Sequence, residues 1–204
     1  MMAPMTFEIF TALAAFAFVT SVTPGPNNLM LMASGANFGV RRTVPHALGV
    51  AIGFAVMVLL VGVGLVGLFE AFPVSYTVLK VVSVAYLLYL AWKIATASGL
   101  GEKSVAGKPI TFLQAAAFQW VNPKAWSMAL TAVTVYAGSR SFEAVGLVAL
   151  VFGVINLPST GAWAIVGGQM KRLLTDPVRL RTFNVVMAVL LVASLYPVLF
   201  SAQH

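Results

Sequence analysis

The stretch TPGPNNLML, residues 23–31, interrupts an apolar segment that runs from about Met5 into the 30s. Its two prolines and its glycine are expected to end a helix, because proline lacks a backbone donor and its ring clashes with the preceding turn. In lipid, the carbonyl groups that a break releases need another partner, so breaks persist only where they face protein or a wet cavity. The stretch therefore predicts a broken membrane helix whose break faces the protein interior.

The composition of the whole chain indicates that its solvent is lipid. Of its 204 residues, 60% are hydrophobic and 8% are charged, and the mean hydropathy is +0.97. A soluble domain carries roughly 25% charged residues. The net charge of +7 does not predict nucleic-acid binding, because the basic residues fall in short clusters between apolar runs and form no extended stripe.

The chemical groups that most enzymes need are missing from the chain. It contains no cysteine, and its only histidines, His46 and His204, are far apart in the sequence. Thiolate sites are therefore excluded, and a histidine metal site is not expected. There is also no acid–histidine cluster that would indicate a catalytic site. We expect no metal, no cofactor and no enzymatic activity.

Six segments are apolar enough and long enough to cross a bilayer, which takes about 20 residues in a helix. The sequence therefore predicts an all-α membrane protein with six transmembrane helices. Because the six segments fill nearly the whole chain, we expect a single transmembrane domain over residues 1–204. The segments are Met5 into the 30s, Ala47–Phe69, Pro73–Trp92, Thr111–Ala137, Ala144–Met170 and Thr182 to the end.

Lysine and arginine residues concentrate in the loops of one side. Nine of them follow the first, third and fifth spans, whereas the opposite side has only Arg140. The positive-inside rule places the nine in the cytoplasm and both termini outside. The nine are Arg41, Arg42, Lys93, Lys103, Lys108, Lys171, Arg172, Arg179 and Arg181.

A second break, FQWVNPKA at residues 118–125, interrupts the fourth span. Pro24 and Pro123 are 99 residues apart, and each lies in the first helix of a three-span half. Two halves with an odd number of spans lie upside down relative to each other, and paired breaks in such halves point to a transporter's binding site. We therefore expect two inverted repeats, about 1–100 and 105–204, with broken helices 1 and 4. Ordinary proline kinks are the alternative.

The first break offers groups that suit a carboxylate. Pro26 fits the first position of a restarted helix. The amides of Asn27, Asn28 and Leu29 would then lack partners at the positive end of that helix, which is a site for an anion. Lys124 adds a full positive charge at a similar depth. A centred lysine costs about 2.5–3.5 kcal/mol in a bilayer, so we expect it to face the interior, with snorkelling to the interface as the alternative.

Other polar residues complete the predicted site. Asn122 and the carbonyls that the prolines release would hold an ammonium group. Asn156 lies in the middle of the fifth span, where it could join the cavity or bond to a neighbouring helix. His46 is expected to be an interfacial anchor rather than a proton relay. The predicted substrate-binding residues are Pro24, Gly25, Pro26, Asn27, Asn28, Asn122, Pro123, Lys124 and Asn156.

At these residues the chain resembles the LysE/RhtB family of amino-acid exporters. The resemblance covers nearly the whole chain, and the motifs come in the family's order and spacing. Many family members have Asp after Pro-Gly-Pro, whereas this chain has Asn27. It is most similar to the branch that includes cysteine and O-acetylserine exporters. The matching motifs are Thr23–Asn28, Gly35, Gly39–Arg42, Ala85–Lys93, Ala91–Thr96, Lys108–Ile110 and Val121–Ala125.

The resemblance implies export of small amino acids or their derivatives across a bacterial inner membrane, driven by the proton motive force. Asn27 argues against a cationic substrate, and the resemblance to the branch with cysteine and O-acetylserine exporters implies a small neutral amino acid. No Asp or Glu lies deep in any span, so protons remain open as the coupling ion and their carrier is not identified. The alternative is a small-solute channel or an exporter of other metabolites. The sequence leaves the oligomeric state open.

Overall fold

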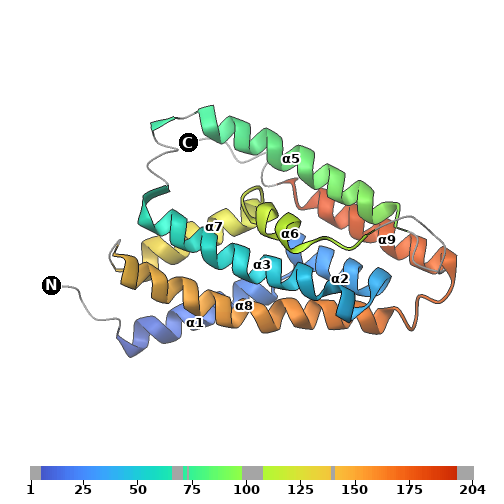
Figure 1. Ribbon diagram of the computed structural model, residues 1–204, viewed down its shortest axis with the longest axis horizontal. Coiled ribbons are helices and arrows are strands. Elements are labelled where there is room, and N and C mark those ends of the chain that lie inside the picture. Colours follow the sequence, from blue (N-terminus) through green and yellow to red (C-terminus); the bar gives the residue numbers. More distant parts are fainter. Residues whose placement is uncertain (1–5, 66–70, 73, 98–107, 139–140, 197–204) are drawn as a thin grey trace.

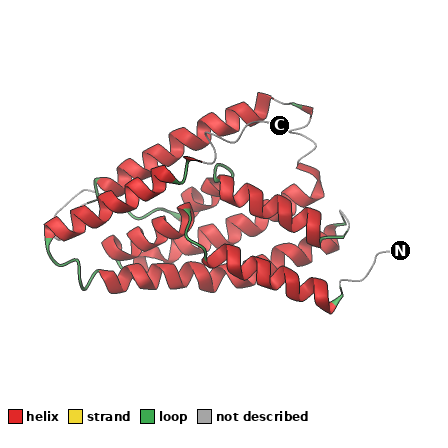
Figure 2. Ribbon diagram, turned by 180° about the vertical axis from the view of Figure 1, so that it is seen from behind, coloured by secondary structure: helices red, strands yellow, loops and turns green. Residues whose placement is uncertain are grey.

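The computed structural model describes residues 6–65, 71–72, 74–97, 108–138 and 141–196, and in these ranges it contains helices and no strand (Figure 1; Figure 2). The predicted all-α fold is thus confirmed for the described residues. The elements are α1 (Phe7–Val22), α2 (Pro26–Phe38), α3 (Val40–Leu60), the π-helical turn η1 (Val61–Leu65), α5 (Val74–Ala95), α6 (Phe112–Gln119), α7 (Pro123–Tyr136), α8 (Phe142–Met170) and α9 (Pro177–Ala193).

Three helical segments are long and apolar enough to cross a membrane by themselves: Val40–Leu65, Thr77–Ala95 and Phe142–Met170. Helices α1 and α2 qualify together as one span that bends by 51°. Helices α6, α7 and α9 have 8, 14 and 17 residues and do not qualify by length. The structure therefore supports three to four spans, and the six-span topology and the inverted repeat stay predictions.

Both predicted helix breaks are present at the expected residues. Helix α1 ends at Val22, and α2 begins with Pro26 in its first turn after an extended Gly25. Helix α6 ends at Gln119, and α7 begins with Pro123 after the N-cap. Proline is tolerated at these positions because the first amides of a helix have no intrahelical acceptor in any case.

Helix α3 begins at Val40, seven residues before the apolar segment that the sequence predicted as a span. The preceding Gly39 separates α2 from α3 with a φ of 83°, a conformation that glycine adopts without steric cost. The basic residues Arg41 and Arg42 consequently lie in the first turn of a helix rather than in a loop.

Helix α8 packs against α1, α2 and α3 and forms the centre of the bundle. Its contact with α2 depends on residues without side chains. A Cβ on Gly167 would overlap the carbonyl oxygen of Met32, and a Cβ on Gly35 would overlap that of Ala164. Small residues let membrane helices approach this closely, and packing then replaces the hydrophobic driving force that lipid does not supply.

Glycine residues also allow α3 and α6 to pack closely. A Cβ on Gly53 would lie 2.6 Å from the Cα of Ala116, and a Cβ on Gly49 would overlap the carbonyl group of Phe112. Gly49 and Gly53 are four residues apart on one face of α3, a spacing of small residues that is typical of closely packed membrane helices.

Two large apolar clusters fill most of the bundle, beside a small third one around Leu174 and Leu180, and the chain passes from one large cluster to the other at the breaks. The first cluster includes Met30 of α2 and Phe118 of α6. The second includes Ala17 of α1 and Ala125 of α7. The buried or half-buried polar residues between these positions form what we call the polar layer: Ser21, Asn27, Asn28, Gln119, Asn122, Lys124, Asn156 and Ser159. The fold thus places a polar band between two apolar halves.

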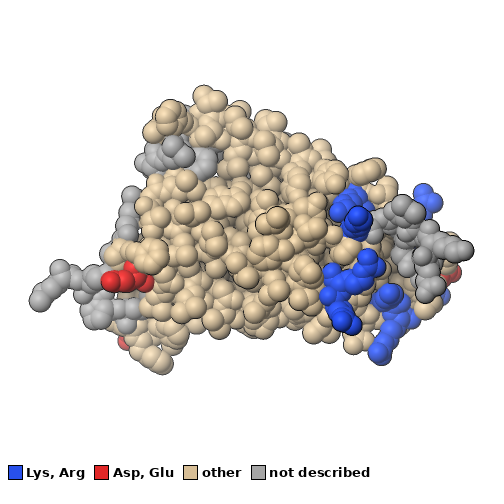
Figure 3. Space-filling model, viewed as in Figure 1, with Lys and Arg blue, Asp and Glu red and all other residues tan. Residues whose placement is uncertain are grey.

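The basic residues gather at one end of the bundle, where Asp176, the N-cap of α9, also lies (Figure 3). Figure 3 shows the Lys and Arg side chains gathered at one end, where α2 and α8 end and α3 and α9 begin. The opposite end carries Glu8 at the start of α1 and Glu143 at the start of α8. Lys103 and Arg140 lie outside the described residues. The predicted one-sided distribution is confirmed for the charges that the structure describes.

We predict that Gly167→Ala destabilises the fold, because the added methyl group forces α8 away from the backbone of α2. Overpacking of this kind costs roughly 1–3 kcal/mol. Gly161→Ala, on the same helix, is the matched control, since a Cβ at Gly161 would meet nothing within 4 Å. The measurement is the melting temperature of purified protein in detergent. The Gly167 variant should melt several degrees lower, and equal melting temperatures would contradict the packing described here.

Candidate functional site

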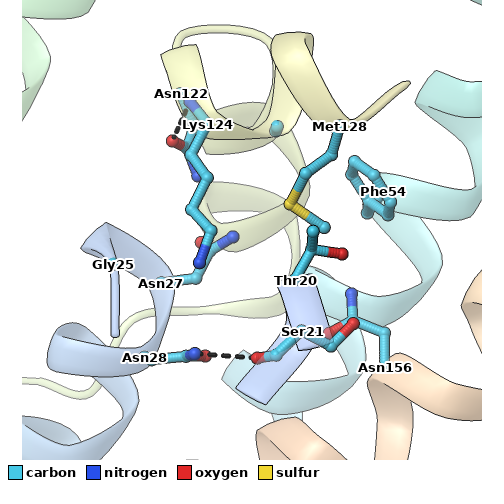
Figure 4. A pocket seen from close by; sticks show the side chains of 11 residues that line it. Thr20, Ser21, Gly25, Asn27, Asn28, Phe54, Asn122, Lys124, Met128 and Asn156 are labelled. Carbon is cyan, nitrogen blue, oxygen red and sulfur yellow. Dashed lines mark hydrogen bonds between the residues drawn. The ribbon is translucent and has the colours of Figure 1, made fainter. Parts of the chain in front are cut away.

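The two helix breaks meet in the polar layer and enclose a cavity there. The empty space, including that at its open mouth, is about 340 Å³. The walls come from α1, the start of α2, α3, the start of α7 and α8 (Figure 4). The lining residues are Thr20, Ser21, Gly25, Asn27, Asn28, Phe54, Asn122, Lys124, Ala125, Met128 and Asn156. We call this space the central cavity.

The backbone carbonyls that the first break releases determine much of the polar layer. In a continuous helix they would accept from amides four residues further on. Instead, the Thr23 carbonyl accepts from Asn28 Nδ2 and from Lys124 Nζ, each at 2.8 Å. The Ser21 carbonyl accepts from Asn28 Nδ2 at 2.8 Å and from Ser159 Oγ at 2.9 Å. Side chains from α2, α7 and α8 thus replace the missing helical hydrogen bonds.

Lys124 reaches from the start of α7 to the first break, as expected for an interior lysine rather than one that snorkels to the interface. Its stem crosses Gly25 so closely that a Cβ on this glycine would lie 2.8 Å from Lys124 Cδ and 3.2 Å from Nζ. Gly25 has φ −172° and ψ 179°, which any residue adopts. Glycine is therefore needed at this position to leave space for the Lys124 side chain and not to permit an unusual backbone conformation.

The start of α2 presents free backbone donors at the cavity. No acceptor for the amides of Asn27 and Asn28 occurs among the described residues. The amide of Leu29 donates to the Gly25 carbonyl at 3.0 Å, so the prediction that it lacks a partner is wrong. The physical reason is that the N-cap residue already supplies the first helical acceptor. Two free amides at a positive helix end remain, and the Lys124 ammonium lies beside them.

The Asn27 side chain is paired with Gln119 across the two breaks. Asn27 Nδ2 donates to Gln119 Oε1 at 2.8 Å, and Gln119 Nε2 donates back to Asn27 Oδ1 at 3.1 Å. Gln119 Nε2 also donates to the Ala115 carbonyl at 2.8 Å. An aspartate at position 27 would lose one bond of this pair because a carboxylate does not donate. Gln119 is thus the local partner that suits an amide, and its side chain is fully buried.

Asn122 has a local role as well as a place in the cavity wall. Its Oδ1 accepts from the backbone amide of Lys124 at 3.1 Å, which makes it the N-cap of α7. The predicted role of Asn122, an acceptor for a substrate ammonium, therefore competes with capping. Because the cap orients the first turn of α7, Asn122 positions Lys124 in the cavity.

Two polar groups of the lining have no hydrogen-bond partner among the described residues. One is the hydroxyl of Ser21, whose oxygen is fully buried. The other is the side-chain amide of Asn156, a cavity-lining residue that is 6% exposed and has no hydrogen bond in the described part of the chain. Figure 4 shows Asn156 extending from α8 toward Ser21. Burial of a polar group without a partner is costly. These two groups are therefore available for hydrogen bonds to a molecule in the cavity.

The remaining walls are apolar and carry no negative charge. Phe54 and Met128 face the space opposite Lys124 (Figure 4). No Asp or Glu lines the cavity among the described residues, and no group of three or more His, Asp or Glu in that part of the chain could hold a metal ion. The cavity combines one full positive charge, donors at a helix end, neutral oxygen acceptors and an apolar wall.

The structure brings most of the predicted site residues together. Six of the nine line the central cavity, namely Gly25, Asn27, Asn28, Asn122, Lys124 and Asn156. The prolines at 24, 26 and 123 are not among the lining residues and act through the breaks that they impose. Of the polar residues near Asn156 on α8, Ser159 bonds across to α1 and Thr160 bonds within α8.

Sequence reasoning missed five lining residues, Thr20, Ser21, Phe54, Ala125 and Met128. It also missed Gln119, which does not line the cavity but pairs with Asn27. For Gln119 and Ser21 a signal exists, since each is a polar residue directly before a break in an apolar run. For Phe54 and Met128 none does, because they resemble any other core residue.

The predicted interfacial position of His46 is wrong. The helix α3 starts earlier than expected, so His46 lies inside the bundle with no exposed surface. Neither ring nitrogen has a hydrogen-bond partner in the described part of the chain.

Comparisons with known proteins agree with this architecture. Residues 18–195 match the family model described as LysE type translocator. The chain is 30% identical over 190 residues to the cysteine/O-acetylserine efflux protein of Escherichia coli (strain K12), which covers 92% of this chain and 96% of that protein. The protein of the same name from Shigella sonnei (strain Ss046) matches over the same shares. No solved structure matches the chain. Because the family match and these relatives span most of its length, the chain belongs to the LysE type translocator family.

Proposed function

We propose that this translocator exports small neutral amino acids or their derivatives from the cytoplasm, by alternating access and at the expense of the proton motive force. The observation that carries the proposal is the central cavity, in which Lys124 and the free amides of α2 face neutral oxygen atoms, with no acid among the described lining residues. The efflux of cysteine and O-acetylserine that the names of the relatives state is in keeping with this chemistry.

The substrate carboxylate would bind at the start of α2. Helix N-termini bind anions because their free amides and the helix dipole act together. The amides of Asn27 and Asn28 supply donors, and the Lys124 ammonium supplies a full charge that is held within 2.8 Å of the Thr23 carbonyl. A carboxylate would exchange this neutral acceptor for a charged one, which forms a stronger hydrogen bond.

The substrate ammonium would bind the neutral acceptors at Ser21 and Asn156. Both groups are buried and have acceptor atoms to offer. Because neither carries a charge, they suit the ammonium of a zwitterion but do not compensate the second positive charge of a cationic amino acid. The apolar wall of Phe54 and Met128 would then take a short side chain, which sets a limit to substrate size.

Alternating access requires contacts around the site that can be exchanged. Helix α2 carries two reciprocal amide pairs, Asn27 with Gln119 near its start and Asn37 with Asn184 near its end. Amide pairs of this kind can reform with other partners without leaving a charge unpaired. We place the chain in the bacterial inner membrane as a single domain, with the basic end in the cytoplasm and both termini periplasmic.

We predict that Lys124→Ala and Asn27→Ala each lower export at least tenfold, because the first removes the charge that meets the carboxylate and the second removes the pairing of the two breaks. The assay is efflux of labelled cysteine or O-acetylserine from preloaded liposomes, with and without a pH gradient. Lys80→Ala is the control, since Lys80 does not line the cavity.

Full export by both variants, present in the membrane at wild-type amounts, would refute the site. Flux in the wild-type protein that neither saturates nor depends on a gradient would indicate the alternative, a small-solute channel. Saturable export of other metabolites without any amino acid would indicate the second alternative.

Gly25→Ala tests the position of the lysine rather than its presence. The added methyl group would lie 2.8 Å from Lys124 Cδ, so the flexible side chain must move while the extended backbone stays as it is. We expect a threefold to tenfold higher KM for export and an unchanged melting temperature. Gly161→Ala, where a Cβ meets nothing within 4 Å, should leave both quantities unchanged. An unchanged KM in the Gly25 variant would show that Lys124 does not contact the substrate from this position.

The proposed orientation predicts the behaviour of reporters at the C-terminus. Alkaline phosphatase, which is active only outside the cytoplasm, should be active when fused after His204, whereas green fluorescent protein fused there should remain dark. The opposite pattern would place the basic end outside and would contradict the positive-inside assignment.

A further inference from the structure

A second cavity lies further along α2, toward the basic end of the bundle. Its empty space, including its open mouth, is about 390 Å³. The wall consists of one face of α2 from Met30 to Phe38, the end of α5 and the segment 108–110. Helix α2 therefore lines the central cavity with its first turn and the second cavity with the rest of its length.

The native hydrogen bonds leave few polar groups free in this cavity. Asn37 Nδ2 donates to Asn184 Oδ1 at 2.7 Å and to the Ala33 carbonyl at 2.8 Å. The Ser34 hydroxyl lies 3.0 Å from that of Thr43. The Ala97 carbonyl accepts from Asn184 at 2.8 Å. The polar lining provided by these groups is thus already satisfied within the protein.

Two ammonium groups remain. Lys93, at the end of α5, and Lys108 both line the cavity, and neither has a hydrogen bond or an ion pair among the described residues. No Asp or Glu belongs to the described lining. Two unpaired positive charges at one cavity attract an anion and raise its local concentration.

The rest of the wall is apolar. Met30 and Leu90 are 1% and 2% exposed, and Ile94 and Ile110 are each 8% exposed. These side chains would contact the hydrocarbon part of a ligand whose anionic group meets the lysines. The lining therefore fits a small amphipathic carboxylate better than an inorganic anion, which would leave the apolar wall without a partner.

We propose that the second cavity is a carboxylate-binding vestibule, in which Lys93 and Lys108 capture the exported substrate before it reaches the central cavity. The identity of the ligand as the exported amino acid rests on the proposed function, whereas the carboxylate site rests on its own lining. The turn of α2 from Asn27 to Met30 separates the two cavities and is bonded to Gln119. Passage from one cavity to the other thus requires this turn to move.

The binding test uses butyrate, which has a carboxylate and a short apolar chain but no ammonium group. Saturation-transfer NMR on purified protein in phosphatidylcholine nanodiscs measures the affinity for butyrate. All variants carry Lys124→Gln, which removes the positive charge of the central cavity. Adding Lys93→Gln and Lys108→Gln should weaken butyrate binding at least fivefold. The control pair Lys80→Gln and Lys171→Gln, which also removes two positive charges outside the second cavity, should leave it unchanged, and Lys93→Arg with Lys108→Arg should retain it.

Equal butyrate binding with and without Lys93 and Lys108 would overturn the proposal. The proposal would also be overturned if short-chain phosphatidylglycerol bound in a way that depends on Lys93 and Lys108 while butyrate did not, because the cavity would then be a lipid site.

In protein with Lys124 intact, Lys93→Gln with Lys108→Gln should raise the KM for export at least fivefold with kcat within twofold, and an unchanged KM would overturn the capture role. Butyrate binding that depends on the lysines in a protein that exports no amino acid would refute the proposed function and leave the carboxylate site standing.

Discussion

The need to satisfy backbone carbonyls inside an apolar bundle governs this structure. The break between α1 and α2 releases the carbonyls of Ser21 and Thr23, and no water-exposed surface is needed to satisfy them. Asn28, Lys124 and Ser159 donate to these oxygens from three different helices. A lysine in such a position would otherwise be costly. The same contacts that supply donors to these carbonyl groups also bring together the polar groups of the proposed binding site.

Helix α2 is the element on which the two cavities depend. It is held against α8 by contacts that only glycine permits, at Gly35 and Gly167. Its ends are fixed differently, by amide pairs with Gln119 and Asn184. Close packing gives this helix a rigid side, and the amide pairs give it polar contacts that can be exchanged. This combination suits a helix that lies between two cavities.

The asparagine at position 27 has a structural explanation. Its amide both donates to and accepts from Gln119, which a carboxylate would not do. The cavity beside it has Lys124 as its charged group and no acid in the described lining. In the function we propose, a substrate that is neutral overall would meet this balance, with its carboxylate at the positive end of α2 and its ammonium among neutral oxygens. The amide at position 27 is therefore matched by the partner that the second break provides.

The sequence by itself determined the helical class, the positions of both breaks, the segregation of basic residues and six of the residues that line the cavity. These follow from local properties: hydropathy, the missing donor of proline and the cost of polar groups in lipid. Only the tertiary structure decided that Gln119 pairs with Asn27, that Asn122 is engaged as a cap and that Ser21 and Asn156 remain without partners. It also decided the burial of His46 and the choice of Phe54 and Met128 as walls. Such contacts join residues far apart in the chain, and they depend on how closely the helices approach at their glycines, a distance that no local pattern in the sequence encodes.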